Sequence, residues 1–513
     1  MTQFVPACPP GLPVGPDWVT TPTSESVTFP FTGEHVGLAP VGTVQLATEA
    51  ITHAERLRAE AAALPSHARR AVLAQAQRVL SERRDELEQL LVLETGKPLV
   101  DCRVEVDRTL LTLTTSAEEV AHLHGETVPL DLLPSGEGLI GFWVRKPIGV
   151  VVGIAGYNYP LLLAAHKLAP ALAAGCPVVI KPAPQTPLAT LWLVHVVREA
   201  LAAAGASRGL VQLVTGGVEV GVALTTDRRV GAVSFTGSAS VGHTIARDAA
   251  PTKVLLELGS NSALVVAGDA DIEAAADAVV RGGYYASGQA CISVQRVVVV
   301  QAVRDEFLAT LASRMDQVVV GDPRKPETRV AALIDARSTQ RVSAWIKAAV
   351  EAGATLMHGG SVEGGMLVPA VLLDVPDSQA AWDEEIFGPV VAVRSVPTVR
   401  EAFDVVNRSR YGLHASVFTS SLETAFHAID VIEAGGVVIN EVPGFRSDVM
   451  PYGGVKDSGV GREGPRFAID ELTVTRMAII RPSFGGPRPS TPAPSTSRPT
   501  GNAPDQSSQE ETR

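Results

Sequence analysis

The middle of the chain alternates between short apolar runs and longer segments with helical periodicity. Continuous apolar runs of strand length are typical of parallel strands covered on both faces. The expected strands cover residues 149–155, 177–181, 209–214, 232–235 and 253–258, and the expected helices cover 160–174, 187–204, 218–225 and 240–249. Strands that alternate with helices predict a doubly wound parallel sheet, with ligands at the carboxyl ends of its strands.

A second alternating series begins with four consecutive valines at 297–300, which are typical of a buried strand. Further strands are expected at 390–394 and 436–440, and helices at 304–315, 338–352 and within 418–435. This series predicts a second α/β domain. The chain has 513 residues, too many for one hydrophobic core, so two or three domains are expected.

Both ends of the chain differ from this pattern. Residues 1–26 are rich in Pro, Gly and Thr, and residues 482–513 are rich in Pro, Ser and Thr. Such segments cannot bury enough apolar surface to fold, so we expect both to be disordered.

Composition excludes several classes of function. A net charge of −12 leaves no basic excess for nucleic acid or an anionic membrane surface. Four scattered Cys do not form a disulfide framework, and no Cys or His pair has the spacing of a metal site. No signal peptide or run of membrane-spanning length is visible. We expect a cytoplasmic protein without a metal.

Cys291 lies between a helical pattern at 271–285 and the valine strand, with Gly288 just before it. A thiol at such a junction can point into a cleft, as a nucleophile requires. Taken alone, a free Cys is more often an inert buried residue.

Other polar residues lie where the first sheet should bind ligands. Asn158 precedes a helix, and is either a helix cap or an amide donor for an oxyanion. Glu257 ends an apolar strand, where a carboxylate needs a partner or has a raised pKa. Lys181 also ends a strand, and Gly237-Ser238 form either a tight turn or a phosphate site at a helix N-terminus.

Several segments together resemble the aldehyde dehydrogenase superfamily, over residues 32–480. In chain order they read Tyr-Asn-Tyr-Pro, Val-Ile-Lys-Pro, Phe-Thr-Gly-Ser, Leu-Glu-Leu-Gly, Gly-Gln-Ala-Cys, Glu-Glu-Ile-Phe-Gly-Pro and Pro-Tyr-Gly-Gly-Val-Lys-Asp-Ser-Gly. The resemblance implies a dinucleotide-binding domain (27–123 and 147–256), an α/β catalytic domain (257–462) and a β-strand oligomerisation arm (124–146 and 463–481). It therefore also implies a homodimer or homotetramer.

The resemblance implies a role for each matching residue. Cys291 would attack the aldehyde carbon, Asn158 would stabilise the oxyanion, and Glu257 would activate the water that hydrolyses a thioester to a carboxylate. Lys181 would contact the adenine ribose, Ser238 the pyrophosphate and Glu385 the nicotinamide ribose of NAD or NADP. The full set of implied cofactor residues is Tyr157, Lys181, Gly237, Ser238, Leu258, Glu385 and Phe387. Lys167 and Glu463 also match family positions, as structural or proton-relay residues.

Two departures concern cofactor and substrate. Members that prefer NAD often have a Glu three residues after the cofactor Lys, and Pro184 stands there, so NADP becomes admissible. Members that act on phosphorylated aldehydes tend to have a basic residue before the nucleophile, and Ala290 stands there.

Substrate contacts are implied for Arg108, Tyr159 and Arg446. The two arginines resemble anion-binding positions, although each could instead form a surface salt bridge. An incomplete set of arginines favours a small neutral or singly charged aldehyde, such as a lactaldehyde-like or semialdehyde substrate, over a doubly charged phosphate. Three alternatives remain: a CoA-acylating aldehyde dehydrogenase, an esterase that uses the same Cys, and a non-enzymatic member of the fold.

Overall fold

The computed structural model describes residues 8–482, which form two compact units. The first unit comprises residues 8–125 and 144–476, and the second comprises 126–143 and the described residues from 477 onward. The tail predicted to be disordered, apart from Pro482, and the first seven residues lie outside the described part of the chain.

The first sheet has the predicted parallel strands. Its strand order is β9-β8-β7-β10-β11, and β23 (Gly459–Val460) adds to β11 in the antiparallel direction. The bounds are β7 (Val150–Ile154), β8 (Val178–Lys181), β9 (Val211–Leu213), β10 (Val230–Thr236) and β11 (Lys253–Glu257). The strand order reverses between β7 and β10, which is the position where doubly wound sheets bind ligands.

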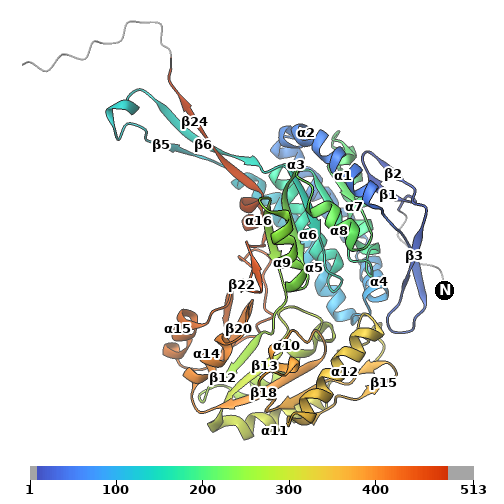
Figure 1. Ribbon diagram of the computed structural model, residues 1–513, viewed down its shortest axis with the longest axis vertical. Coiled ribbons are helices and arrows are strands. Elements are labelled where there is room, and N and C mark those ends of the chain that lie inside the picture. The colour runs from blue at the N-terminus through green and yellow to red at the C-terminus, as the bar shows by residue number, and fades with distance from the viewer. Residues whose placement is uncertain (1–7, 483–513) are drawn as a thin grey trace, which may run out of the picture. The chain divides into compact units, whose positions relative to one another are not determined.

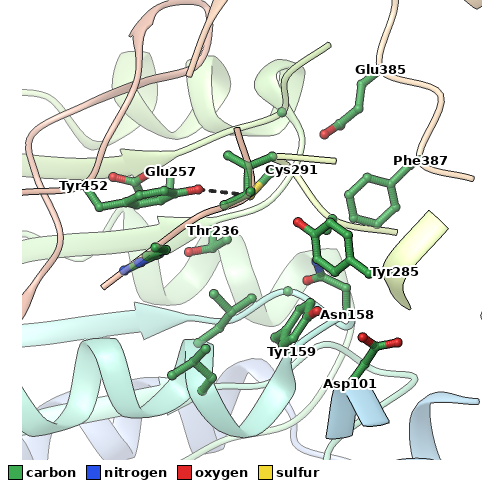
Figure 2. Close-up of a pocket in the computed structure, with 18 of the residues that line it drawn as sticks. Asp101, Asn158, Tyr159, Thr236, Glu257, Tyr285, Cys291, Glu385, Phe387 and Tyr452 are labelled. Atoms are coloured by element: carbon green, nitrogen blue, oxygen red, sulfur yellow. Dashed lines mark hydrogen bonds between the residues drawn. The ribbon is translucent and has the colours of Figure 1, made fainter. Parts of the chain in front are cut away.

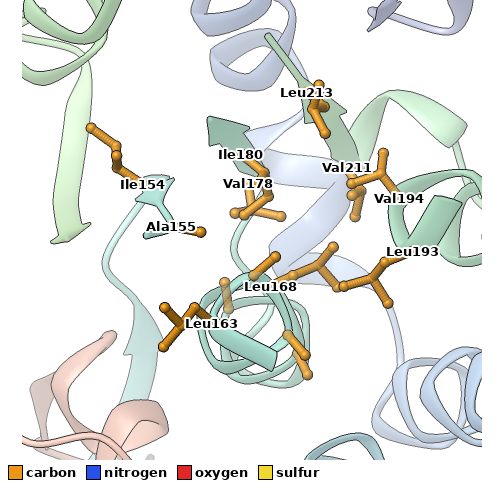
Figure 3. Close-up of a cluster of buried hydrophobic side chains, with 14 of the residues drawn as sticks. Ile154, Ala155, Leu163, Leu168, Val178, Ile180, Leu193, Val194, Val211 and Leu213 are labelled. Atoms are coloured by element: carbon orange, nitrogen blue, oxygen red, sulfur yellow. The ribbon is translucent and has the colours of Figure 1, made fainter. Parts of the chain in front are cut away.

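Helices follow these strands as the apolar pattern predicts, namely α6 (Pro160–Ala174), α7 (Leu188–Ala203), α8 (Val218–Thr225) and α9 (Ala239–Ala249). The fixed φ of Pro160 suits the first position of α6, and Gly175 ends the helix in the left-handed conformation at φ 84. Apolar side chains of β7, β8 and β9 pack against α6 and α7 in one buried cluster (Figure 3).

The helices before this sheet join the same core: α1 (Val44–Arg56), α2 (Arg58–Ala63), α3 (Ser66–Glu82), α4 (Arg84–Thr95) and α5 (Leu99–Glu119). Two buried glutamates bind the N-termini of helices packed against them. Glu94 accepts hydrogen bonds from the backbone N–H groups of Leu188 and Ala189, and Glu105 accepts from those of Leu161 and Leu162. Helix N-termini favour a carboxylate because their first N–H groups have no intrahelical acceptor.

The second sheet of the first unit has the order β14-β17-β18-β13-β12-β20-β21 (lower half of Figure 1). Successive residues of its strands point to opposite faces, so Leu264 and Val297 join one buried cluster whereas Val265 and Val298 join the other. The strands are β12 (Ala263–Val266), β13 (Arg296–Val300), β14 (Thr355–His358), β17 (Ala370–Leu373), β18 (Val390–Val396), β20 (His414–Phe418) and β21 (Gly436–Ile439). Its helices are α10 (Ile272–Tyr284), α11 (Arg304–Met315), α12 (Ala336–Glu351), α13 (Ala380–Asp383), α14 (Val399–Asn407) and α15 (Leu422–Val431), whereas α16 (Pro465–Glu471) packs against α5 and α6 in the core of the first sheet.

The prediction of disorder for residues 1–26 is wrong for residues 8–26. This segment contains β1 (Leu12–Val14), β2 (Asp17–Val19) and β3 (Ser24–Thr28), and β3 pairs with β4 (His35–Pro40). The fully buried Arg198 of α7 explains the order, because its guanidinium donates to the carbonyls of Gly15 and Pro16 at distances of 3.0 and 2.8 Å. Composition cannot reveal this long-range anchor.

The second unit contains β5 (Glu126–Val128), the first half of β6 (Ile140–Pro147) and the end of β24 (Thr473–Ile480), in the sheet order β24-β6-β5. The predicted arm extends too far at its second segment. Residues 463–476 belong to the first unit, because Ile469 and Leu472 are buried in its core. Across residues 8–482, no helix has the length and apolar character required to cross a membrane.

Candidate active site

A cavity of about 520 Å³ collects the predicted site residues of the first unit. Its walls come from the loops after β7, β10 and β11, the loop before β13, the loops that precede β18 and β22 (Val455–Lys456), and side chains of α5, α6 and α10. Every predicted catalytic, cofactor and substrate residue except Lys181 lines this cavity. Figure 2 shows Cys291, Asn158, Glu257 and Glu385 around it.

Cys291 follows a strained turn that ends α10. Ala286 and Ser287 have left-handed φ angles of 49° and 57°, and Gly288 has φ 72°. A Cβ at Gly288 would collide with the carbonyl oxygen of Gly388, so this position requires glycine. Such strain at a functional turn persists only where surrounding contacts hold it.

The Cys291 thiol lies 3.2 Å from the Tyr452 hydroxyl. Burial raises the pKa of Cys291 to about 11, against the opposing effect of the Tyr452 hydrogen bond. The resting group is therefore a protonated thiol at neutral pH, and its activation requires a base.

Asn158 lies in the loop between β7 and α6 and is not the helix cap, because Tyr159 occupies that position. Its Nδ2 donates to the Gln289 carbonyl at 2.8 Å, two residues before Cys291. An amide nitrogen carries two N–H groups, so a second donor remains for the cavity. This contact fixes the orientation of the amide beside Cys291.

Glu257 ends β11 with its side chain buried in the cavity wall. Its Oε2 has no hydrogen-bond partner within the described residues, although the atom is buried. Burial, and then the charge of Glu463, raise the pKa of Glu257 well above its usual value. An unpaired buried carboxyl with a raised pKa has the properties of a general base.

Glu463 is equally buried but fully paired. It lies 3.0 Å from the ammonium group of Lys167, which also donates to Thr236 Oγ1 at 2.7 Å. Burial alone would raise the pKa of Glu463. The charges of Lys167 and His166 instead hold this pKa well below its usual value. The two neighbouring glutamates are thus shifted in opposite directions.

A charged cluster beside the cavity contains Arg108 and Arg446 with their partners His166, Asp448 and Glu463. Arg108 donates to both carboxylate oxygens of Asp448, at 2.9 and 2.8 Å, and Arg446 donates to Glu463 at 3.2 Å. Both arginines form the salt bridges of the alternative interpretation, but not on the surface, because the side chains of Arg108 and Arg446 are only 22% and 6% exposed.

His166 links the two carboxylates, with ring nitrogens 3.1 Å from Asp448 and 3.2 Å from Glu463. Hydrogen bonds from His166 and Arg108 hold the pKa of Asp448 well below its usual value, although burial opposes this effect. The charged cluster is therefore a connected network of ion pairs.

The predicted cofactor residues extend from this cavity along the first sheet. Burial lowers the pKa of Lys181 to about 8, against the charge of Glu219, and no carboxylate of the described residues lies within ion-pair distance of its ammonium group. Ser238 precedes α9, and its side chain caps none of that helix's N–H groups in the described structure. Burial raises the pKa of Glu385 to about 7, although the Ser260 N–H donates to it.

The remaining predicted residues complete the walls. Phe387 and Tyr157 meet edge to face at 5.7 Å, and Tyr159 packs its ring under the Lys97 ammonium at 3.6 Å. Gly237 donates its N–H to the Glu257 carbonyl at 3.1 Å, and Leu258 is buried against Gly242.

Sequence reasoning missed Tyr452, His166, Asp448 and Asp101, although all four contribute to the site or its support. Tyr452 stands in the recognised Pro-Tyr-Gly-Gly segment, so that motif could have indicated it. Asp448 and Asp101 carry no local signal, because their partners are distant in the chain.

Comparisons with known proteins identify the family of the chain. The sequence model of the aldehyde dehydrogenase family matches residues 18–478. The 3-sulfolactaldehyde dehydrogenase of Priestia aryabhattai is 39% identical over 92% of this chain and 98% of its own length.

Solved structures show the same similarity. Aldehyde dehydrogenase 21 from Physcomitrella patens, in complex with the reaction product succinate, superposes with a TM-score of 0.87 at 34% identity, over 92% of this chain and 99% of that one. The NADP-dependent glyceraldehyde-3-phosphate dehydrogenase from Bacillus halodurans, complexed with NADP, superposes with a TM-score of 0.88 at 33% identity over the same shares. The chain therefore belongs to the aldehyde dehydrogenase family and is an NAD(P)-dependent enzyme of aldehyde oxidation.

Proposed function

We propose that the chain oxidises a small aldehyde, neutral or with one negative charge, to its carboxylate through a thioester on Cys291. One observation carries this proposal: Cys291, Asn158 and Glu257 line the same cavity, and Glu257 keeps a buried oxygen without a partner among the described residues.

Cys291 forms the first bond. Its thiol first loses its proton to a solvent base, the thiolate sulfur then adds to the carbonyl carbon, and the carbonyl π electrons move to the oxygen, which acquires a negative charge. The free N–H of Asn158 is placed to donate to that oxygen while its other N–H remains on the Gln289 carbonyl. One preorganised donor of this kind stabilises a transition state by about 3 kcal/mol.

The residues at the edge of the first sheet fit a dinucleotide. Lys181 supplies a buried cation, α9 supplies uncapped N–H groups beside Ser238, and Glu385 supplies a carboxylate for a ribose hydroxyl. A bound nicotinamide supplies the hydride acceptor for the oxidation. Pro184 places no carboxylate against a 2′-phosphate, so both NAD and NADP are expected to bind.

Glu257 is suited to the second half of the reaction. Water that attacks the thioester must lose a proton, and Glu257 Oε2 is a buried acceptor without a protein partner in the described chain. The ionised Glu463 increases the proton affinity of Glu257, because two like charges at close range are unfavourable. These properties favour hydrolysis over release by CoA.

The arginines support the assignment of substrate charge. Each arginine of the described residues that lines the cavity already has a carboxylate partner: Arg108 with Asp448, Arg281 with Glu441, and Arg446 with Glu463. A dianion needs unpaired cations to offset its desolvation, whereas a neutral aldehyde or a monoanion needs less compensation. Ala290 adds no cation beside the nucleophile.

A matched aldehyde panel tests the function. Lactaldehyde, succinate semialdehyde and glyceraldehyde 3-phosphate span the three charge states, and reduction of NAD and of NADP is followed with and without CoA. We expect turnover of the first two without CoA and the lowest kcat/KM for the phosphate. Strict dependence on CoA, ester hydrolysis without cofactor reduction, or preference for the phosphate would each contradict the proposal.

We also propose that the second unit is an oligomerisation arm. Leu132, Leu133 and Ile479 are 84%, 68% and 61% exposed, and a three-stranded sheet is too small to bury them itself. Replacement of Leu132 and Leu133 by Ser is expected to reduce the molar mass measured by light scattering from an oligomer to a monomer. An unchanged mass would exclude this role.

We also propose that the protein is located in the cytoplasm. The catalytic mechanism requires Cys291 as a free thiol, and the four Cys of the chain are unpaired in the structure. Cell fractionation with an antibody against the chain tests the location directly.

A further inference from the structure

One turn of α5 contacts both halves of the catalytic site. Asp101 and Glu105 are four residues apart, so they lie on the same face of the helix. Both are buried, with 8% and 0% exposure, and Figure 2 shows Asp101 below Asn158 and Tyr159. Neither residue has a role in the reaction described above.

Glu105 holds the helix that carries the oxyanion donor. Its Oε1 accepts hydrogen bonds from the N–H groups of Leu161 at 2.9 Å and Leu162 at 3.2 Å, in the first turn of α6. Its Oε2 pairs with the buried ammonium of Lys97. Asn158 stands two residues before α6, so its backbone is tied to this carboxylate.

Asp101 holds the loop that carries the nucleophile. Its Oδ2 accepts a hydrogen bond from the Ala286 N–H at 2.9 Å, at the first residue of the left-handed turn before Cys291. Left-handed conformations of Ala and Ser are unfavourable, so this turn needs contacts that hold it. The side chain of Ser287, which bonds to Ala331, supplies another such contact.

The two anchors meet across the site. The Asn158 amide donates to Gln289 in the loop held by Asp101, while its own backbone follows the helix held by Glu105. The geometry points to Asp101 and Glu105 as positioning residues that together set the separation between the Cys291 sulfur and the Asn158 amide. This inference rests on the proposed roles of Cys291 and Asn158.

Positioning of this kind acts on the chemical step. A displacement of about 1 Å at a reacting group can cost on the order of 10²-fold in rate. The cofactor residues Lys181 and Ser238 lie on elements that neither carboxylate contacts, so cofactor affinity should not change.

The test replaces Asp101 by Ala and by Asn. Asp101→Ala removes the acceptor of the Ala286 N–H, and we expect kcat to fall about 10²-fold, with KM for the aldehyde and Kd for NADPH little changed. Asp101→Asn keeps an oxygen acceptor, so most of the rate should return. Asp107→Ala on the same helix is the control, because Asp107 is 57% exposed and pairs only with Arg84.

Thermal unfolding shows whether each variant is folded. If Asp101→Ala does not fold, Asp101→Leu fills the same space without an acceptor and takes its place. A loss of rate that follows a loss of folded protein, or an equal loss for Asp107→Ala, would overturn the inference.

A double-mutant cycle with Asn158→Ala separates positioning from general structural damage. If Asp101 acts through the Cys291–Asn158 geometry, the loss caused by Asp101→Ala should shrink to roughly 3-fold or less when the amide is absent. If the rate losses of Asp101→Ala and Asn158→Ala multiply fully in the double variant, the inference is overturned, whereas the role of Asn158 stands. A full rate for Asn158→Ala alone would overturn both the role of Asn158 and the inference built on it.

Discussion

The reactive pair Cys291 and Glu257 and the charged cluster next to it handle their ionisable groups in opposite ways. Around Cys291 and Glu257, burial raises both pKa values, and Glu257 Oε2 has no partner among the described residues. Around Asp448 and Glu463, burial is comparable, but arginine, lysine and histidine partners hold the carboxyl pKa values low.

The difference separates reactive groups from positioned charges. A general base must accept a proton during the reaction, so a raised pKa and a free lone pair suit it. A carboxylate that orients an arginine must remain ionised, and a closed set of ion pairs achieves this in a buried site. Substitutions at Cys291 or Glu257 should therefore change kcat. Substitutions in the charged cluster should change KM for the aldehyde and the selectivity for its charge.

The largest expected effect is at Cys291, the proposed nucleophile. Cys291→Ala should lower the rate of NAD(P)H formation by at least ~10⁴-fold, the scale for removal of a nucleophile, because no other thiol lies in the described cavity. Binding of NADPH, measured by fluorescence titration, should remain. Cys8→Ser is the control, since Cys8 is outside the cavity, and residual turnover in Cys291→Ala would refute the assignment.

Glu257→Gln should stop turnover at the thioester. We expect a burst of NAD(P)H close to one per active site, followed by a steady rate about 10²- to 10⁴-fold below that of the wild type. Absence of the burst would assign Glu257 to activation of the thiol instead of the water.

The pH profile of the same variant sharpens this result. Glu257 must be ionised to accept a proton and its pKa is raised, so wild-type kcat should fall as pH decreases through that pKa. Glu257→Gln should lose this limb of the profile. A limb that persists in the variant would belong to another group.

Asn158→Ala should reduce kcat by about 10²- to 10³-fold, the usual effect of removing one oxyanion donor. KM for the cofactor should change little, because the amide contacts the Gln289 carbonyl and faces Cys291. Stopped-flow measurement of the first turnover shows the step that slows. A change in KM alone would indicate substrate binding in place of oxyanion stabilisation.

The smallest expected effect is at the Arg108–Asp448 pair of the charged cluster. The double variant Arg108→Gln, Asp448→Asn removes a paired cation and anion together, so no buried charge is left alone. KM for a singly charged aldehyde should increase about 10-fold, the scale of one charged hydrogen bond, whereas kcat and KM for a neutral aldehyde should change little. Arg84→Gln with Asp107→Asn is the matched control at an exposed ion pair. An equal increase in KM for the neutral aldehyde would contradict the distinction between the reactive pair and the charged cluster.

The sequence by itself determined the first sheet and the candidate catalytic residues that line the cavity. The strands of the first sheet are continuous apolar runs, and Asn158, Glu257 and Cys291 each stand in a short segment beside a strand or helix terminus. Local periodicity and local motifs carry this information because the chemistry depends on the loops that those termini present.

Only the tertiary structure decided how the charges are paired. Arg108 and Asp448 are 340 residues apart, His166 and Glu463 are 297 apart by number, and Asp101 meets Ala286 from a distance of 185 residues. The order of residues 8–26 likewise depends on Arg198, far along the chain. Side-chain pairing at such separations follows from the packing of elements and leaves no periodic or local pattern in the sequence.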